Sequence, residues 1–252
     1  KFCMREVNYL GYIVGEGGIR TNDEKIVAIN KYPEPKTTRQ VRRFLGMANY
    51  YRKFVKNFSV LAAPLHELTK KGRKFEMTDE ARNSLEQIKT ALTTAPVLVH
   101  PNYHKPFMVQ CDASTSGIGA VLCQVDDDGE ERPIFYYSHK LNKAQRNYSI
   151  TELECLAAVS AVKKFRPYLE MQEFKIITDH SSLRWLMNQK ELSGRLARWS
   201  MSLSGYNFEI EHRKGVENIV PDALSRSLCD VEEIEMCAVE VDLDSPEFEA
   251  ED

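Results

Sequence analysis

The stretch TELECLAAVSAVKKF, Thr151–Phe165, carries two glutamates two positions apart at the start of an apolar run. If the stretch forms an α-helix, with about 100° between successive residues, Glu152 and Glu154 lie about 200° apart. Glu154 then shares the most apolar side of the helix with Ile150, Ala157, Ala158, Ala161 and Phe165. Glu152 falls on the other side, and two apolar residues, Leu156 and Val159, fit neither description. An uncompensated carboxylate on a core-facing stripe costs several kcal/mol, so the sequence predicts a partner for Glu154.

Three aspartates are candidates for that partnership, because each lies at the end of an expected element. Asp112 ends the strand motif KPFMVQCD, Asp179 ends the strand motif IITD, and Asp222 begins a helix after a proline. If the two strands are neighbours, Asp112 and Asp179 emerge side by side next to the helix of Glu154. Each aspartate also has a simpler explanation, since Asp179 and Asp222 suit helix N-caps and Asp112 suits a turn.

A cluster of four carboxylates has a distinctive chemistry. The carboxylates would repel one another and shift their pKa values unless cations were present. Oxygen ligands without Cys or His suit hard ions, Mg²⁺ or Mn²⁺. Two such ions a few ångströms apart suit phosphodiester hydrolysis, since one activates water and the other stabilises the leaving oxygen. The sequence thus predicts a two-metal hydrolase that acts on a polyanion.

The charge of the chain is distributed unevenly. The 252 residues have a net charge of −3, but residues 230–252 hold eleven Asp or Glu and no Lys or Arg. The rest of the chain has 26 acidic and 34 basic residues, a net charge of about +8. This balance fits a body that meets polyanions, and it also fits an ordinary solvated surface followed by a disordered acidic tail.

Cysteine usage and hydropathy favour a reducing, aqueous environment. The six cysteines form no CxxC pair, so we expect free thiols and neither a zinc site nor a disulfide framework. The sequence has no signal-peptide pattern and no apolar run of about 18 residues, so we expect a protein that is not secreted. The chain begins with Lys1 and not with Met, and its first residues already belong to a structural pattern. We therefore interpret the chain as a fragment of a longer protein.

The pattern along the chain predicts three parts: a hairpin with helices (1–95), an α/β domain (96–228) and a disordered acidic tail (229–252). In the first part, VNYLGYIV and GGI are expected to form a two-stranded hairpin around GEGG. Three helices should follow, the first beginning at a capping box of Thr21 and Glu24. The second should begin at Thr38, with basic flanks and an apolar face that reaches Val55, and the third at Thr78.

The second part has a different periodicity. After a proline-containing connector, residues alternate with period two in KPFMVQCDAS, GIGAVLCQV and RPIFYYSHKL, which predicts three strands. The helix of Glu154, the strand EFKIITDH, two short helices, the strand NFEIEHRKG and a terminal helix follow. The predicted order βββ-α-β-α-α-β-α is typical of a mixed five-stranded sheet with flanking helices, an α/β fold.

Four motifs in this part resemble the C-terminal region of reverse transcriptases from gypsy-type LTR retrotransposons and related retroviruses. They are DASTSGIGAVL, YSITELECLAAVSAVKKFRPYL, IITDHSSLRWL and HRKGVENIVPDALSR, and they cover nearly all of residues 107–226 in order. The resemblance implies a ribonuclease H (RNase H)-like domain with an Asp-Glu-Asp-Asp site. Matched motif by motif, that site is Asp112, Glu154, Asp179 and Asp222. Family members often have a lysine where this chain has Leu153.

The resemblance also implies an activity. The domain would cleave the RNA strand of RNA–DNA hybrids with two Mg²⁺ or Mn²⁺ ions, Asp112 bridging both, and leave 3′-hydroxyl and 5′-phosphate ends. His212 matches a loop histidine that assists water or product in the family, although a surface histidine at a strand end is an equal alternative. Ser114 and the backbone near Gly117 are expected to contact the 2′-hydroxyl of the RNA.

The first part resembles other segments of the same enzymes. YLGYIV, which contains Tyr9, Gly11 and Tyr12, is similar to the primer-grip hairpin, and FLGMANYYRKFVKNFSVLAAPL is similar to the thumb. By this resemblance a basic rim that includes Arg42, Arg43 and Lys53 would hold the template–primer duplex, although basic helical flanks are usually plain solvated surface. The chain contains no Tyr-x-Asp-Asp motif, so we expect no polymerase activity without the fingers and palm of the enzyme.

Two further expectations follow from the resemblance. The protein would be part of a retrotransposon polyprotein located in the cytoplasm, in virus-like particles or in the nucleus. The alternative to an active nuclease is a catalytically silent RNase H fold that serves as a nucleic-acid-binding or tether module.

Overall fold

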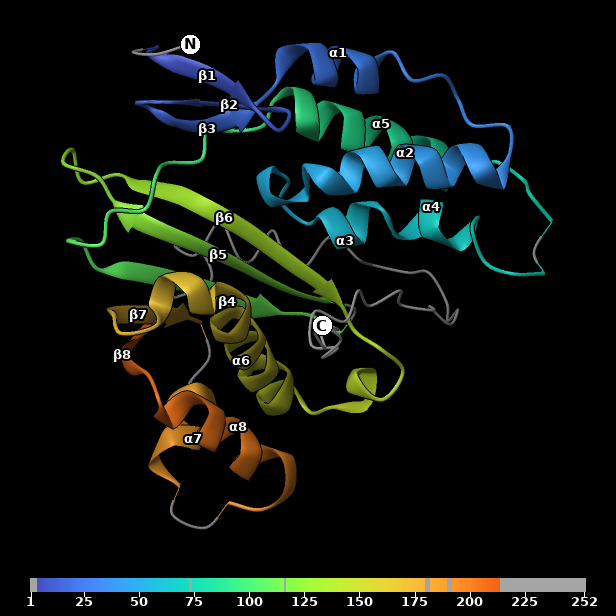
Figure 1. The fold of residues 1–252 in the computed structure, drawn as a ribbon. Helices are drawn as coiled ribbons and strands as arrows, with labels where there is room; N and C mark the ends of the chain where they lie inside the picture. Colours follow the sequence, from blue (N-terminus) through green and yellow to red (C-terminus); the bar gives the residue numbers. More distant parts are fainter. Residues whose placement is uncertain (1–3, 73, 116, 180–181, 190–191, 214–252) are drawn as a thin grey trace, which may run out of the picture.

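The computed structural model describes residues 4–213, apart from 73, 116, 180–181 and 190–191. In Figure 1 the described residues form two packed parts. We call the first the helical module, which consists of β1–β3 and the helices up to α5. We call the second the sheet domain, which consists of β4–β8 and α6–α8. Within the described residues, no helix is long and apolar enough to cross a membrane.

The helical module begins with a three-stranded antiparallel sheet: β1 (Glu6–Tyr9), β2 (Tyr12–Gly15) and β3 (Gly18–Thr21). The predicted two-stranded hairpin was therefore wrong by one strand. VNYLGYIV does not run straight, because Leu10 and Gly11 both have positive φ (48° and 79°). Positive φ at both central residues is characteristic of tight two-residue hairpin turns, so this motif forms a hairpin by itself.

Short helices complete the module: α1 (Asp23–Asn30), α2 (Thr38–Tyr50), the 3₁₀ helix η1 (Arg52–Phe54), α3 (Phe58–Leu61), α4 (Ala63–Glu67) and α5 (Asp79–Thr93). Two of the three predicted helix starts were one residue off. The side chain of Asn22, not Thr21, caps α1 by accepting from the Lys25 amide, and Thr37 caps α2. The start of α5 at Thr78 is confirmed. The errors arose because adjacent residues (Thr21-Asn22 and Thr37-Thr38) can both act as caps.

The core of the module forms around the apolar face of α2. The predicted residues Val41, Phe44, Leu45 and Ala48 are all buried there. Val55 is also buried, but it lies beyond η1 and not on α2, which ends at Tyr50. The basic flanks predicted for α2 thus belong to a helix that is anchored by one well-packed face.

The sheet domain contains the predicted mixed five-stranded sheet, with strand order β6-β5-β4-β7-β8. The strands are β4 (Phe107–Ala113), β5 (Gly117–Val125), β6 (Glu131–Lys140), β7 (Glu173–Thr178) and β8 (Asn207–His212). Strands β4, β5 and β6 pair antiparallel, whereas β7 is parallel to both β4 and β8. The first and fourth strands of the domain are therefore neighbours, as the clustering of Asp112 and Asp179 required.

Helix α6 (Ile150–Leu169) is the central helix of this domain, and it is buried on two sides. One side packs on β4 and β5, and the other side contacts α7 (Ser182–Asn188) and α8 (Gly194–Ser204). This second contact explains why Leu156 and Val159, which did not fit the predicted apolar face, are buried. Ile150, predicted on the core face, is 68% exposed at the first position of the helix.

The two parts of the chain contact each other directly along β6, an edge strand of the larger sheet. Arg52 Nη2 donates to the backbone carbonyl of Ser138 (2.9 Å), and the Ser59 amide donates to the Ser138 hydroxyl (3.1 Å). A second connection pairs Ile19 with Leu98, whose backbones exchange two hydrogen bonds of 2.7 and 2.9 Å. Helices of the module therefore cover the β6 edge, which would otherwise be open to pairing with another chain.

Gly18 allows this second connection to form, so we expect Gly18→Ala to destabilise the protein. Gly18 has φ +129°, and a Cβ there would lie 2.3 Å from the Leu98 carbonyl oxygen. The expected loss is about 2–3 kcal/mol, from backbone strain and displacement of the pairing. Thermal and urea unfolding measure it. Gly17→Ala is the matched control, because a Cβ at Gly17 has no neighbour within 4 Å; equal effects of the two substitutions would contradict this account.

Candidate active site

The register of two strands positions the first pair of carboxylates. In the parallel pairing of β4 with β7, Gln110 lies opposite Ile177. Asp112 and Asp179 each follow two residues later, so both lie at the carboxyl ends of adjacent parallel strands. Asp112 is 5% exposed, and Asp179, just beyond the last residue of β7, is half-buried.

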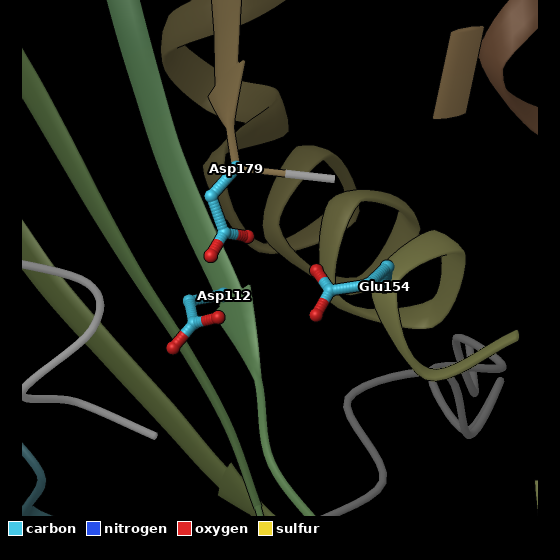
Figure 2. A group of neighbouring side chains, drawn as sticks. All are labelled: Asp112, Glu154 and Asp179. Atoms are coloured by element: carbon cyan, nitrogen blue, oxygen red, sulfur yellow. The ribbon is translucent and has the colours of Figure 1, made fainter. Parts of the chain in front are cut away.

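Glu154 joins this pair from the adjacent helix. Its side chain is 6% exposed and extends from the N-terminal part of α6. Figure 2 shows the three carboxylates turned toward one another, with Asp112 from β4, Asp179 after β7 and Glu154 from the helix. One oxygen of each carboxylate lies within 4.8 Å of those of the other two, so the group could hold a metal ion. The predicted partnership of Glu154 with Asp112 and Asp179 is thus found in the structure.

The surroundings of Glu154 favour its neutral form when no cation is present. The pKa of its carboxyl is raised to about 9. Burial is the largest cause, and the charges of Asp112 and Asp179 add to it. A hydrogen bond from the Ala113 backbone amide acts in the opposite direction. Glu154 Oε2 is buried and has no hydrogen-bond partner among the described residues. A buried acid with an unsatisfied oxygen is costly, and a bound cation would remove that cost.

The cysteines described by the structure are buried free thiols, as expected: Cys111, Cys123 and Cys155. Two of them adjoin the carboxylates in sequence. Burial, together with the nearby carboxylates, raises the pKa of Cys111 well above its ordinary value and that of Cys155 to about 12. Both sulfurs therefore stay protonated at neutral pH, when they are poor metal ligands and poor nucleophiles.

His212 lies beside the carboxylates at the end of β8. Its Nε2 is 2.9 Å from the backbone carbonyl oxygen of Asp179, and its side chain is exposed. Because a carbonyl can only accept, Nε2 carries the proton in this contact, which leaves Nδ1 of a neutral ring with the lone pair. The histidine is thus both a surface residue at a strand end and a neighbour of Asp179. Its position is compatible with a role in the reaction and with a plain surface residue, and it does not decide between them.

Glu152, two residues before Glu154, has a different environment. It forms a capping box with Ser149, in which the Ser149 amide donates to Glu152 Oε2 (2.9 Å) and the Ser149 hydroxyl accepts from the Glu152 amide (3.3 Å). Arg195 of α8 lies 3.6 Å from its other oxygen. Glu152, which was predicted on the other side of the helix from Glu154, therefore has contacts of its own, and these belong to the helix start and not to the carboxylate group.

Asp222, the fourth predicted carboxylate, lies outside the described residues, as do the predicted terminal helix and the acidic segment 229–252. Its assignment still depends on the motif DALSR alone.

Ser114 directly follows β4 and Gly117 begins β5, and the two residues bond to each other. The Ser114 hydroxyl donates to the Gly117 carbonyl (3.0 Å) and accepts from the Gly117 amide (3.1 Å). A Cβ at Gly117 would lie 3.1 Å from the His139 carbonyl oxygen. These groups shape the turn next to Asp112, and their predicted contact with an RNA 2′-hydroxyl stays a prediction.

The residues of the YLGYIV motif are held against the end of α2. The Tyr51 hydroxyl donates to the Gly11 carbonyl (2.9 Å), and the Tyr12 hydroxyl donates to the Tyr50 carbonyl (3.1 Å). The Tyr12 and Tyr50 rings stack, with centroids 5.1 Å apart. Tyr9, in contrast, is 62% exposed. The hairpin is therefore anchored through its turn and leaves Tyr9 available for contact.

The predicted basic residues differ in how free they are. Arg43 is exposed, and Arg42 is exposed but donates to the Thr69 carbonyl through Nη2 (2.9 Å). Lys53 Nζ lies 4.2 Å from the centroid of the Tyr12 ring, a cation–π contact, and partial burial lowers its pKa. Arg42 and Arg43 thus lie on the first half of α2, whereas Lys53 lies just beyond α2 and contacts the hairpin at Tyr12.

The family model for the RNase H-like domain found in reverse transcriptase matches residues 102–206. This part of the chain is an RNase H-like domain. The match covers β4 to α8, including the three clustered carboxylates, and the five-stranded sheet agrees with that fold.

Curated relatives extend the similarity over nearly the whole chain. The Tf2-3 and Tf2-4 transposon polyproteins of Schizosaccharomyces pombe are each 40% identical over 238 residues, which is 93% of this chain. The chain spans only 18% of the length of these relatives. The chain is therefore similar to one segment of these transposon polyproteins.

Solved structures show the same arrangement of both parts. A foamy viral protease–reverse transcriptase, described in complex with double-stranded DNA, aligns with a TM-score of 0.72 and 25% identity, covering 83% of this chain and 38% of its own. The foamy viral enzyme in complex with an RNA/DNA hybrid also has a TM-score of 0.72, with 24% identity, and covers 93% of this chain and 32% of its own. The predicted fold, an RNase H-like α/β domain preceded by a small, mostly helical module, is confirmed.

Proposed function

We propose that this chain is the RNase H part of a gypsy-type retrotransposon reverse transcriptase and that it hydrolyses the RNA strand of RNA–DNA hybrids. The observation that carries the proposal is the buried group of Asp112, Glu154 and Asp179, whose oxygens lie within 4.8 Å of one another. A buried acid on an apolar helix face has no use in packing, whereas a hydrolytic metal site requires it.

The residues fit divalent cations. The donor atoms are all carboxylate oxygens, which Mg²⁺ and Mn²⁺ prefer, and Glu154 Oε2 lacks a hydrogen-bond partner among the described residues. Asp112, Glu154 and Asp179 would hold two such ions, with Asp222 completing the group. When bound, the ions supply an activated water and stabilise the leaving oxygen of the phosphodiester.

The chain itself contributes position and proton handling. The Ala113 amide orients the Glu154 carboxylate, and the adjacent parallel strands fix the separation of Asp112 and Asp179. His212, whose Nε2–H is directed to the Asp179 carbonyl, presents Nδ1 as the nitrogen able to accept or return a proton at the edge of the site. Ser114 and Gly117, in the turn after Asp112, would lie beside the RNA strand.

The proposal predicts cleavage of a labelled RNA strand in an RNA–DNA hybrid by the protein with Mg²⁺ or Mn²⁺. A chelator should abolish cleavage, and restoring either ion should recover it, because the carboxylates alone cannot neutralise the developing charge. The same RNA paired to RNA, or single-stranded, serves as the control and should stay intact. The assay is repeated with the fingers and palm of the parent enzyme added, so that weak substrate binding by the isolated chain is not mistaken for lack of activity.

If the hybrid binds to the isolated chain and to the chain with fingers and palm added, but is never cleaved, the protein is instead a silent RNase H fold that tethers nucleic acid. That outcome would retain the fold assignment and overturn the enzymatic one.

The helical module has a separate part in this proposal, which is to hold the template–primer duplex. The exposed Tyr9 and the turn at Gly11 and Tyr12 would meet the primer, and Arg42, Arg43 and Lys53 would contact backbone phosphates. Neutralising these three cations by glutamine should weaken duplex binding and lower the slope of log K against log[salt] by about 0.9 per lost contact. Binding is measured by fluorescence anisotropy over a salt series, and an unchanged slope would remove these residues from the duplex-binding surface.

The remaining parts of the proposal concern context. The rest of the reverse transcriptase, its fingers and palm, would be the protein partner of this chain. The parent polyprotein would act in the cytoplasm, in virus-like particles or in the nucleus. We retain the division into residues 1–95, 96–228 and 229–252 as the proposed domain boundaries.

A further inference from the structure

A second group of charged side chains lies where the helical module meets the sheet domain, apart from the three carboxylates. Lys70 Nζ is 2.9 Å from Glu67 Oε2, and Lys140 Nζ is 3.9 Å from Glu67 Oε1. The side chains of Glu67, Lys70 and Lys140 are only 16–20% exposed. Two lysines from different parts of the chain thus share one carboxylate in a partly buried position.

The cations outnumber the acid in this group. Among the described residues, the charges that act on Lys140 are those of Glu67, Arg146 and Lys70, and of these Glu67 alone is acidic. Burial, Arg146 and Lys70 lower the pKa of Lys140, while Glu67 raises it. The same surroundings act on His66, since burial and then nearby Lys140 lower its pKa as well. Arg146 Nε is buried and has no hydrogen-bond partner among the described residues.

An excess of partly buried cations costs stability unless an anion is available to them. Two parts of the chain contribute to the group. Glu67 is the last residue of α4 and Lys70 lies three residues beyond it, whereas Lys140 ends β6 and Arg146 lies in the 3₁₀ helix η2 (Gln145–Asn147). Its side chains keep part of their surface in solvent, so an anion can reach them from outside.

We propose that Lys70, Lys140 and Arg146 bind a backbone phosphate of a nucleic-acid duplex at the junction of the two parts. This inference rests on the proposed function, because it supplies a further contact for the same substrate. The cations concerned are not those of the predicted rim on α2.

The register of the sheet places this site close to the carboxylates. Asp112 pairs with Gly119 on β5, and Gly117, two residues before Gly119, pairs with Lys140 on β6. Two strand spacings and a two-residue offset put the backbone of Lys140 about 12 Å from that of Asp112. One strand of a duplex carries a charge every ~3.4 Å of helix axis. The bound phosphate would therefore belong to the same duplex, within a few base-pair steps of the cleaved bond.

Lys140→Gln tests this site. Binding of an RNA–DNA hybrid and of double-stranded DNA of the same sequence is measured by fluorescence anisotropy in EDTA, over a salt series. We expect both affinities to fall roughly three- to tenfold near 0.1 M salt and the salt slope to decrease by about 0.9, since one phosphate contact is lost. Lys163→Gln removes the same charge from an exposed position on α6 and is the matched control.

Two further measurements separate binding from structure. Lys140→Gln should not lower the midpoint of thermal unfolding, because it relieves repulsion, and Lys140→Arg should recover the salt slope. An unchanged slope in Lys140→Gln, or failure of Lys140→Arg to recover it, would overturn the inference. A loss confined to the hybrid would also overturn it, because a phosphate contact is shared by both duplexes.

The result is independent of cleavage. If the wild-type protein never cleaves a hybrid but Lys140→Gln lowers the salt slope, the proposed enzymatic activity fails while the phosphate site stands. If the protein cleaves hybrids and the slope is unaffected, the phosphate site fails alone.

Discussion

Glu154→Gln should abolish cleavage of the RNA strand while leaving hybrid binding nearly intact. Glutamine keeps the size of the side chain and removes the negative charge that would hold a cation next to Asp112 and Asp179. Metal ions contribute several kcal/mol of charge stabilisation in the transition state, and each 1.36 kcal/mol is tenfold in rate. The expected loss in kcat is therefore about a hundredfold or more. Single-turnover cleavage at saturating protein, with Mg²⁺ and with Mn²⁺, measures it.

Glu152→Gln is the matched control, made two residues away on the same helix. Its glutamine can still accept from the Ser149 amide and so preserve the capping box, and its charge is directed toward Arg195 and not toward the carboxylates. We expect activity within about threefold of wild type. If Glu152→Gln is the inactive variant and Glu154→Gln cleaves normally, the site assignment on α6 is wrong.

The same Glu154→Gln substitution should stabilise the metal-free protein at neutral pH. The pKa of Glu154 in the folded protein is about 9, against an ordinary value of 4.5. Between these two values the unfolded chain binds fewer protons than the native one, so stability falls as pH rises through that window. At pH 7 the cost is on the order of 3 kcal/mol, since pH 7 lies about 2.5 units above the ordinary pKa, and glutamine removes it. Thermal unfolding in EDTA should show a midpoint several °C higher for the variant.

The pH series and added metal provide the check on this explanation. The advantage of Glu154→Gln should shrink as the pH falls toward 4.5 and vanish below it, where wild-type Glu154 is neutral in both states. Mg²⁺ should stabilise the wild type increasingly as pH approaches 9, and it should stabilise the variant much less. Parallel pH profiles for the two proteins in EDTA, or equal stabilisation by Mg²⁺, would show that Glu154 does not carry the buried charge.

The sequence predicted the sheet domain well because two periodicities alternate clearly there. Strands of period two and the long apolar helix at Glu154 gave the order that the structure confirms, up to the last described strand. The helical module was harder. Its first strand pair is separated by Leu10 at positive φ, and leucine gives no signal for such a turn. The rotation of the central helix was also only partly predictable, since burial by α7 and α8 on its second side is a tertiary effect.

The site was predictable where chemistry conflicts with packing. Glu154 was identified because an acid on an apolar face needs an explanation, and Asp112 and Asp179 because they end strands. The cation group at the junction gave no such signal. Lys70 and Lys140 are 70 positions apart in a chain with 34 basic residues, and only the packing of the module on β6 brings them together. The assignment of Asp222 still depends on its motif.

The burial of α6 on two sides has a consequence for how the site comes to be ordered. Glu154 cannot move away from Asp112 and Asp179 unless the helix separates from the sheet or from α7 and α8. The three carboxylates are therefore brought together during folding, against their own repulsion, before any substrate arrives. Under the proposed function, cations and hybrid would meet a preorganised acidic site, and relief of the repulsion among its carboxylates would become part of the driving force for binding the cations.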